Sequence, residues 1–242
     1  MNETVRIAMW SGPRNISTAM MRAFENRADT AVVDEPFYAV FLDRTGLGHP
    51  MREEVLRAQP TDPETVARRL SGPAPDGKAI FYQKHMTHHM LEGVDRTWMT
   101  ACANAFLIRS PRRVLASYVA KRSEVTLEEI GFAQQAKIFE SVADRLGHAP
   151  PVLDAEDVHA DPRRALTALC AAVRVPFDEA MLAWPPGRRA SDGVWAPVWY
   201  DAVERSTGFA APPPRSVVLS PELEAMADAA EPHYERLARY RI

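Results

Sequence analysis

The chain has few cysteines, no strong excess of one charge and no long apolar run. Its formal net charge of -3 over 242 residues argues against a nucleic-acid partner, since nucleic-acid-binding domains usually carry a marked basic excess. The two cysteines, Cys102 and Cys170, lie among apolar residues, so we predict reduced core thiols and no disulfide framework. No apolar run approaches the ~20 residues that cross a bilayer, so no membrane partner is expected.

The first residues lack the basic and apolar regions of a secretory signal peptide, which makes the cytoplasm the expected location. The composition, 46% hydrophobic and 25% charged, suits one globular domain over residues 1–242. Residues from about 41–78 are polar, rich in proline and contain two short helical patterns, at 53–59 and 64–70. We interpret this part as a helical lid or insertion over the substrate side.

Strand-like and helix-like patterns alternate along the chain. Short apolar runs, several rich in β-branched residues, predict strands at 5–10, 30–33, 79–83, 104–108 and 151–153. Helical patterns follow them, at 17–24, 111–118, 127–146, 162–173 and 221–240. This alternation predicts an α/β fold in which helices flank a central parallel sheet. A proline-rich stretch at 211–216 is expected to be a linker before the last helix.

A tight basic turn separates the first predicted strand from its helix. Gly12 allows a sharp bend, Arg14 adds a positive charge, and Ser17 and Thr18 add hydroxyl donors. The first N–H groups of a helix lack internal partners, and the helix dipole favours an anion beside them. The pattern therefore predicts phosphate binding, while the alternative is a structural turn capped by Ser17 or Asn15.

This turn is not a Walker A loop. That motif requires Gly, four residues, then Gly-Lys and a Ser or Thr that holds magnesium. Counted from Gly12, those three positions fall on Ser17, Thr18 and Ala19. The loop therefore predicts an anion site without the magnesium of a P-loop.

An acidic pair follows the second predicted strand. Ligands of α/β sheets bind beyond the carboxyl ends of the strands, which favours Glu35 as a site residue. Asp34, shortly before Pro36, is expected instead to cap the helix that follows. The competing interpretation gives both carboxylates a capping role.

Three histidines follow the third predicted strand. His85 is a candidate general base, because its unperturbed pKa is near ~6.5. His88 and His89 are expected to be surface residues. The HxxHH spacing is compatible with metal binding, but no nearby Cys or HExxH pattern supports it, so no metal site is predicted.

A second basic turn follows the fourth predicted strand. Arg109 comes directly after the strand, Pro111 begins the next helix, and Ser117 lies where it can share a ligand with Arg109. For Arg112 and Arg113, the alternative interpretation is that they are solvent-exposed charged residues of the helix. The chain therefore repeats the arrangement of strand, basic turn and helix.

Three segments together resemble the sulfotransferases that use 3′-phosphoadenosine 5′-phosphosulfate (PAPS), over roughly residues 5–193. Residues 13–18, Pro-Arg-Asn-Ile-Ser-Thr, resemble that family's 5′-phosphosulfate loop. Residues 109–118, which begin Arg-Ser-Pro and end Ser-Tyr, match its 3′-phosphate segment. Residues 156–177, with Glu-Asp-Val, Asp-Pro and a final Pro-Phe, are similar to a third family segment. The resemblance implies a P-loop NTPase-like fold.

The resemblance also implies the members of a nucleotide site, which would be Gly12, Pro13, Arg14, Asn15, Ser17, Thr18, Arg109, Ser117, Arg188 and Arg189. The chain departs from the family pattern in three places. Ile16 replaces the loop glycine, and an arginine, Arg14, replaces the family's lysine. The family's C-terminal Lys-x-x-x-Gly-x-x-Gly is echoed by Gly187-Arg188-Arg189 and Gly193.

The expected activity is sulfuryl transfer from PAPS to a hydroxyl or amine of a small-molecule acceptor, without a metal. Arg14 would stabilise the leaving oxygen, with Glu35 as the first candidate base and His85 as the second. Some members of the family use a histidine after the third strand, and certain bacterial members a glutamate after the second. Two alternatives stay open: a phosphotransferase using ATP or GTP on a degenerate P-loop, and a nucleotide-binding module without catalysis, which Ile16 would suit. No oligomeric state is predicted.

Aromatic residues suggest a partly apolar acceptor pocket, although aromatic side chains are also ordinary core residues. The candidates are Phe37, Tyr38, Trp195 and Trp199.

Overall fold

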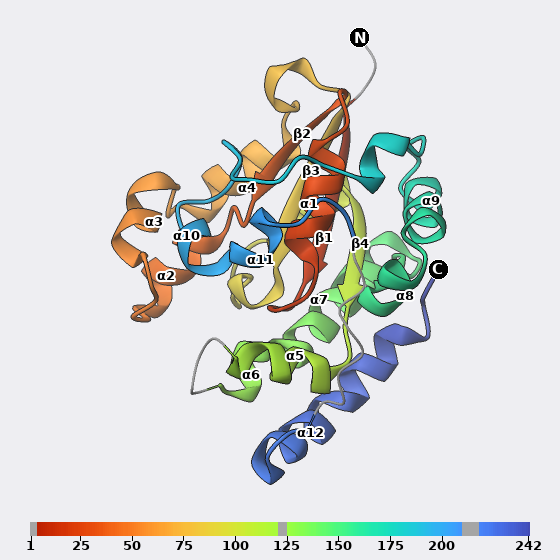
Figure 1. The fold of residues 1–242 in the computed structure, drawn as a ribbon. Helices are drawn as coiled ribbons and strands as arrows, with labels where there is room; N and C mark the ends of the chain where they lie inside the picture. The colour runs from red at the N-terminus through yellow and green to blue at the C-terminus, as the bar shows by residue number, and fades with distance from the viewer. Residues whose placement is uncertain (1–3, 121–124, 210–217) are drawn as a thin grey trace.

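The computed structural model describes residues 4–120, 125–209 and 218–242. Within them lies a sheet of five strands, all parallel, in the order β2-β3-β1-β4-β5 (Figure 1). The strands are β1 (Val5–Ser11), β2 (Thr30–Asp34), β3 (Ile80–Met86), β4 (Ala103–Ile108) and β5 (Val152–Asp154). Each overlaps a predicted strand, which confirms the α/β fold with a central parallel sheet. The predicted linker at 211–216 lies outside the described residues.

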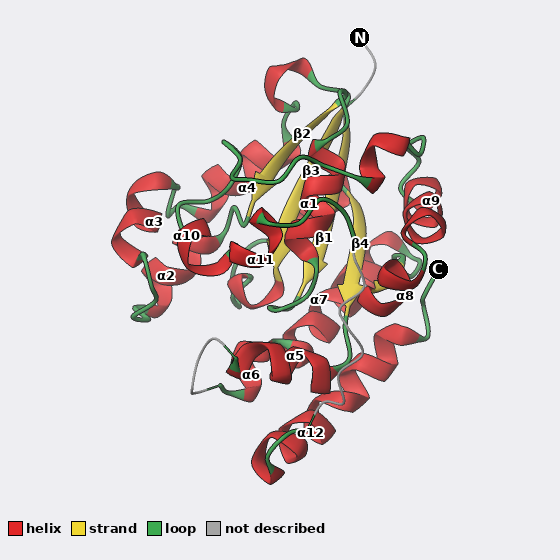
Figure 2. Cartoon of the chain, viewed as in Figure 1, coloured by secondary structure: helices red, strands yellow, loops and turns green. Residues whose placement is uncertain are grey.

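Helices cover both faces of this sheet (Figure 2). Alternate residues of β1 point to opposite faces, so Ile7 and Met9 join one core cluster while Ala8 and Trp10 join another. The first cluster includes side chains of α1 (Ser17–Glu25), α8 (Ala155–Ala160) and α9 (Pro162–Ala172). The second includes side chains of α4 (Pro63–Ser71), α7 (Phe132–Leu146) and α12 (Pro221–Ala238).

The same alternation separates two adjacent residues at the end of β3. Lys84 pairs in register with Met9, and His85 pairs with Trp10. Lys84 therefore faces the side of α1, whereas His85 faces the side of α4 and α7. This difference decides which of the two side chains can reach a ligand.

The predicted insertion at about 41–78 is helical. It contains most of α2 (Tyr38–Thr45), together with α3 (Arg52–Ala58) and α4, close to the predicted bounds. Asp62 caps α4 by accepting a hydrogen bond from the backbone N–H of Thr65 at 2.9 Å, with proline at the first helical position. Because Val66 and Leu70 of α4 are buried against the sheet, α4 is part of the core.

The long helix predicted at 127–146 is wrong as one continuous element. The chain forms α6 (Leu127–Ile130) and α7, separated by Gly131 with φ 72°. That left-handed conformation suits glycine and ends a helix. The apolar spacing continues across the break, which is why periodicity alone did not reveal it.

Short helices complete the described chain. They are α5 (Pro111–Val119), α10 (Ala196–Trp199), α11 (Asp201–Glu204) and 3₁₀ turns at Pro75–Gly77, Thr87–His89, Thr97–Ala101 and Glu179–Leu182. In Figure 1, α10 and α11 lie near the carboxyl ends of the central strands. No helix in the described parts of the chain is long and apolar enough to cross a membrane.

Candidate functional site

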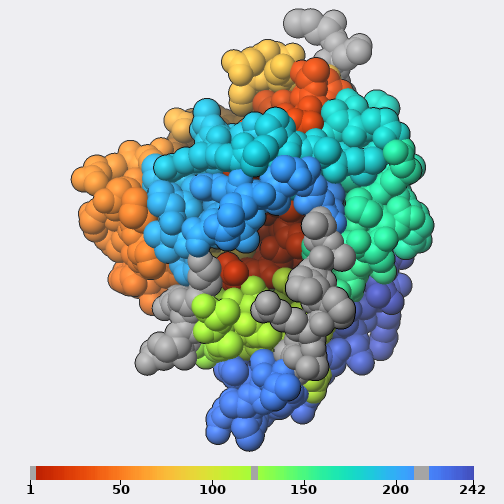
Figure 3. All heavy atoms as spheres, in the orientation of Figure 1, coloured from red at the N-terminus to blue at the C-terminus, as the bar shows by residue number. Residues whose placement is uncertain are grey.

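A cavity of about 1130 Å³ opens at the carboxyl ends of β1 to β4. The residues that follow each of these strands line it: the loop after β1, Glu35 after β2, Lys84 and Met86 at the end of β3, and Arg109 after β4. Figure 3 shows a hollow between the α10–α11 segment and α5, with N-terminal residues at its floor. Its position is the one expected for a ligand site in a parallel α/β sheet.

The loop after β1 is fixed by short contacts. A Cβ atom added to Gly12 would lie 3.0 Å from the carbonyl oxygen of Ile130, so a larger residue would require that carbonyl to shift by a few tenths of an ångström. The Asn15 side chain donates to the carbonyl of Leu107 at 3.0 Å and accepts from the N–H of Ile16 at 2.9 Å. The loop is thereby joined to the end of β4, and it delivers the first turn of α1 to the cavity.

Ile16 fits this loop without backbone strain. Its φ is -84°, a value open to any residue, and its side chain packs against the core cluster of β1 and α1. The glycine that the family pattern has here is therefore not required by the local conformation. The strained position is Arg14 instead, with φ 55°.

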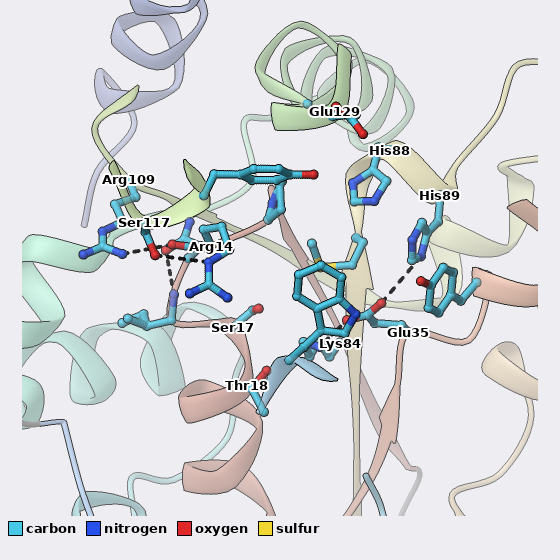
Figure 4. Close-up of a pocket in the computed structure, with 18 of the residues that line it drawn as sticks. Arg14, Ser17, Thr18, Glu35, Lys84, His88, His89, Arg109, Ser117 and Glu129 are labelled. Carbon is cyan, nitrogen blue, oxygen red and sulfur yellow. Dashed lines mark hydrogen bonds and ion pairs between the residues drawn. The ribbon is translucent and has the colours of Figure 1, made fainter. Parts of the chain in front are cut away.

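The two basic turns meet at one end of the cavity (Figure 4). Arg109 Nη1 donates to the backbone carbonyl of Arg14 at 2.9 Å, and Arg14 Nε donates to Ser117 Oγ at 3.1 Å. Burial lowers the pKa of Arg14, and the neighbouring charge of Arg109 lowers it further. Two close, partly buried cations favour an anion, so the contacts support the predicted grouping of Arg14, Arg109 and Ser117.

Other arginines of the second basic turn point elsewhere. Arg113 lies 3.2 Å from the Glu156 carboxylate, which also approaches Arg109 Nε at 3.7 Å. Arg112 faces α12 and pairs with Asp228 at 2.7 Å and Glu224 at 2.9 Å. Arg112 is therefore a helix–helix contact outside the cavity.

A buried ionic network occupies the opposite end of the cavity. Lys84 Nζ donates to Asp34 Oδ1 at 2.8 Å, to Glu35 Oε1 at 2.6 Å and to the Tyr200 hydroxyl at 2.7 Å. All three ammonium protons are thus used. The Tyr200 hydroxyl donates to Asp34 Oδ2 at 2.7 Å and accepts from Trp195 Nε1 at 3.1 Å, which joins the segment around α10 to the sheet.

The helix-capping role expected for Asp34 is wrong. Asp34 is the last residue of β2, and its carboxylate binds Lys84, Tyr200 and the backbone N–H of Gly193. Glu35 then takes a left-handed φ of 42°, and α2 begins only at Tyr38. A lysine fifty residues away in sequence competes for the carboxylate, and local patterns carry no information about it.

Glu35 is only 8% exposed, yet one of its oxygens remains available. Burial raises the pKa of Glu35 to about 7; the Lys84 charge opposes this increase, and Asp34 adds to it. Oε1 contacts Lys84, whereas Oε2 lies 3.9 Å from His89 Nδ1. A carboxylate with a pKa near neutrality, at a strained backbone position beside a cavity, has the properties of a general base.

The structure does not bring His85 to the cavity. Its ring stacks on Trp10 at a centroid distance of 4.3 Å, and its Nε2 lies 3.2 Å from Gln83 Oε1. Burial lowers the pKa of His85 to about 3, so it is neutral at ordinary pH. Its position on the other face of the sheet separates it from Glu35.

His88 and His89, expected at the surface, instead line the cavity, and that expectation is wrong. They lie in the 3₁₀ turn after β3, which turns both rings inward. Among the described residues, no group of three or more His, Cys, Asp or Glu side chains is placed to hold a metal ion.

Arg188 and Arg189 lie away from this cavity. Arg188 is exposed, and Arg189 donates to the carbonyl of Pro185 at 2.8 Å and lies 4.0 Å from Glu25 at the end of α1. The segment that carries them runs past the far end of α1, so neither arginine closes over the cationic pair. The structure therefore does not bring Arg188 and Arg189 to the residues with which the resemblance grouped them.

Several polar side chains that line the cavity were not predicted as site residues, among them Lys84, His88, His89 and Tyr200. The signal for Lys84 was present, because a lysine within a buried strand requires a charged partner. The inward turn of the histidines and the contact of Tyr200 depend on tertiary structure. Of the four aromatic candidates, Tyr38, Trp195 and Trp199 line the cavity, and Phe37 lies in the core.

Comparison with known proteins gives a consistent picture. Residues 5–239 match the family model described as "Sulfotransferase domain". The chain is 38% identical over 225 residues to an Arabidopsis thaliana protein named branched-chain-amino-acid aminotransferase-like protein 1. That match covers 91% of this chain but 40% of the relative, so the chain spans less than half of that longer protein.

Two solved structures share the fold at low sequence identity. A sulfotransferase from Alicyclobacillus acidocaldarius is 12% identical with a TM-score of 0.55, covering 97% of this chain and 94% of that one. The mouse sulfotransferase SULT7A1 complexed with PAP is 13% identical with a TM-score of 0.51, covering 97% and 86%. Both similarities cover 97% of this chain.

Proposed function

Because this chain belongs to the sulfotransferase domain family, we propose that it transfers a sulfuryl group from PAPS to a hydroxyl or amine of a small molecule. The observation that carries the proposal is one cavity with a cationic pair at one end and a carboxylate of raised pKa at the other. Arg14 and Arg109 form the pair, and Glu35 is the carboxylate. Ser17 and Thr18, at the start of α1, lie between them (Figure 4).

The donor half of the cavity suits an anion with two phosphate groups. Ser117 Oγ accepts from Arg14, which leaves its own hydroxyl proton to donate to a phosphate. Arg109 and Ser117 would therefore hold the 3′-phosphate. Ser17, Thr18 and the N-terminus of α1 would hold the 5′-phosphosulfate, where the helix dipole favours an anion.

The reaction is an in-line displacement at sulfur. The acceptor oxygen or nitrogen forms a bond to sulfur, and the bond between sulfur and the bridging oxygen of PAPS breaks. The acceptor proton moves to Glu35 Oε2, and negative charge develops on the leaving oxygen. Arg14 stabilises that charge, and a fixed cation in a partly buried site does so more strongly than water. None of these steps uses a metal ion.

Lys84 acts as a positioning residue in this scheme. Its contact with Oε1 fixes the Glu35 side chain, so that Oε2 faces the acceptor end of the cavity. Its positive charge also lowers the Glu35 pKa, against the larger effect of burial. A base is most effective when its pKa lies near the working pH, and the balance of these effects places Glu35 there.

A thermal-shift experiment tests the nucleotide. A ligand that binds only the folded state raises the melting temperature, so PAP should raise it more than ATP or GTP with magnesium. A larger magnesium-dependent shift with ATP or GTP would favour a phosphotransferase. Tight PAP binding together with no turnover of PAPS would favour a binding module.

A further inference from the structure

Two buried ring nitrogens on residues that line the cavity have no hydrogen-bond partner among the described residues. They are the Nδ1 atoms of His88 and His89. Both residues line the cavity, and His89 is only 2% exposed. Figure 4 shows the two rings next to each other at the same end of the cavity as Glu35. Because an unpaired buried polar atom is costly, these nitrogens are candidates for contacts with a ligand.

The distance between His89 and Glu35 suits one bridging atom. Their Nδ1 and Oε2 atoms are 3.9 Å apart, which is too long for a direct hydrogen bond. A single oxygen atom at hydrogen-bond distance from both would join them. A hydroxyl in that position donates its proton to Glu35 and accepts from the N–H of His89. A hydroxyl held in this way has its proton on the base, as the attacking oxygen requires.

Aromatic packing holds both rings in place. His89 stacks on Tyr38 at a centroid distance of 4.4 Å and on Phe41 at 5.0 Å. His88 meets Phe41 edge-on at 5.6 Å, and the two imidazole centroids are 4.4 Å apart. Both rings are thus held in fixed orientations next to each other.

The charge of these rings selects the kind of group they bind. Burial lowers the pKa of His88 to about 3 and that of His89 well below its usual value, so both rings are neutral. A neutral imidazole offers one donor and one acceptor, and a hydroxyl can match either. An ammonium group can only donate, so it would leave the N–H of His89 without an acceptor, while a carboxylate would be repelled by Glu35.

We propose that the acceptor is an uncharged alcohol with a second hydroxyl on a neighbouring carbon. His89 contacts the hydroxyl that is sulfated, and His88 contacts the second hydroxyl. Trp199, which also lines the cavity and is half-buried, offers an apolar face to the carbon skeleton. This inference rests on the proposed sulfuryl transfer and narrows its acceptor from any hydroxyl or amine to a diol.

Matched pairs of acceptors test the inference, with PAPS as the donor. Catechol is compared with phenol, and trans-1,2-cyclohexanediol with cyclohexanol; benzylamine and benzoate serve as charged probes. The kcat/KM of each diol should exceed that of its monohydroxy partner by roughly tenfold or more, because a polar site rejects an analogue that lacks the matching group. The charged probes should be poor acceptors.

Variants of His88 test whether its contact with the second hydroxyl causes the preference for diols. His88→Ala should lower the diol rate at least several-fold more than the monohydroxy rate. His88→Asn keeps a polar atom near the position of Nδ1 and should restore part of the preference. His148→Ala removes an exposed histidine after α7 and should keep the full preference. Melting curves of each variant confirm that the fold is intact.

Calorimetric binding of PAP to the same samples separates the two proposals. Equal kcat/KM for diols and monohydroxy compounds, or a preference for benzylamine, overturns the diol inference. The proposed sulfuryl transfer still stands in that case, provided that PAP binds. If no probe is sulfated, the affinity of each pair for the PAP complex is compared, and equal or absent affinity also overturns the inference. Failure of PAP to bind removes the proposed function, and this inference with it.

Discussion

Lys84 Nζ lies 2.6 Å from Glu35 Oε1, and this contact gives the two oxygens of the carboxylate different roles. Oε1 is held by the ammonium group, whereas Oε2 faces His89 across 3.9 Å. The two residues lie at the ends of neighbouring strands, β2 and β3. The parallel sheet therefore positions a base and the cation that orients it.

Replacing the base is the first prediction. Glu35→Gln keeps the shape of the side chain and removes its basicity, so kcat should fall by roughly 10² or more. PAP affinity, measured by calorimetry, should change little because Glu35 lies at the other end of the cavity. If Glu35→Gln keeps near-normal turnover and His85→Ala abolishes it, the base is His85.

The pH dependence of kcat/KM gives a second prediction. Glu35 acts in its ionised form, and its pKa is raised to about 7, so activity should rise through neutral pH and level off above about pH 8. His85 has a pKa near 3 and would give no inflection in that range. A flat profile from pH 5 to pH 9 would exclude Glu35 as the base.

The third prediction concerns the stability of the buried network. Lys84→Met leaves the Asp34 and Glu35 carboxylates buried together without their cation, and breaking such a pair costs about 3–5 kcal/mol of unfolding free energy. Lys78→Met removes a lysine outside this network and is the control.

This stability loss should depend on pH in a defined direction. Glu35 already titrates at about 7 in the folded state against 4.5 ordinarily, and loss of Lys84 raises the folded-state pKa further. Between these values the folded state binds a proton that the unfolded state releases, so stability falls as the pH rises. Chemical denaturation should show a larger deficit at pH 8 than at pH 5. An equal deficit at both pH values would mean that repulsion between the carboxylates is not its cause.

A fourth prediction tests the 3′-phosphate contact. A hydrogen bond to a charged group is worth ~1.5–3 kcal/mol, so Arg109→Ala should weaken PAP binding roughly ten- to a hundredfold. Adenosine 5′-phosphate lacks the 3′-phosphate, and its affinity should stay nearly unchanged. Arg112→Ala is the matched control, since Arg112 faces α12. Equal losses for both nucleotides would contradict the assignment.

Local sequence patterns were sufficient to predict the strands of the sheet and three of the side chains that line the cavity. The strands were predictable because each is a short apolar run, and Arg14, Glu35 and Arg109 were predictable because each follows one of those runs. Polar residues at the carboxyl ends of parallel strands meet at one edge of the sheet. The structure confirms that these three side chains line one cavity.

The errors share a physical cause, which is dependence on tertiary contacts. The role of Asp34 is decided by Lys84 from another strand, and the failure of His85 to reach the cavity is decided by strand alternation at the extended end of β3. Arg188 and Arg189 were predicted as site residues only from a partial match to a family motif. In the structure, Arg189 lies instead near Glu25 at the end of α1. Such contacts are invisible to periodicity and spacing.

Sulfuryl transfer is tested most directly by following ³⁵S from labelled PAPS to a small-molecule acceptor. The purified protein is incubated with labelled PAPS and the acceptor panel, and both labelled product and released PAP are measured. We expect equal amounts of product and PAP from the wild-type protein and a large loss of both with Glu35→Gln. Labelled product no greater than in the absence of protein, despite bound PAP, would contradict sulfuryl transfer as the function.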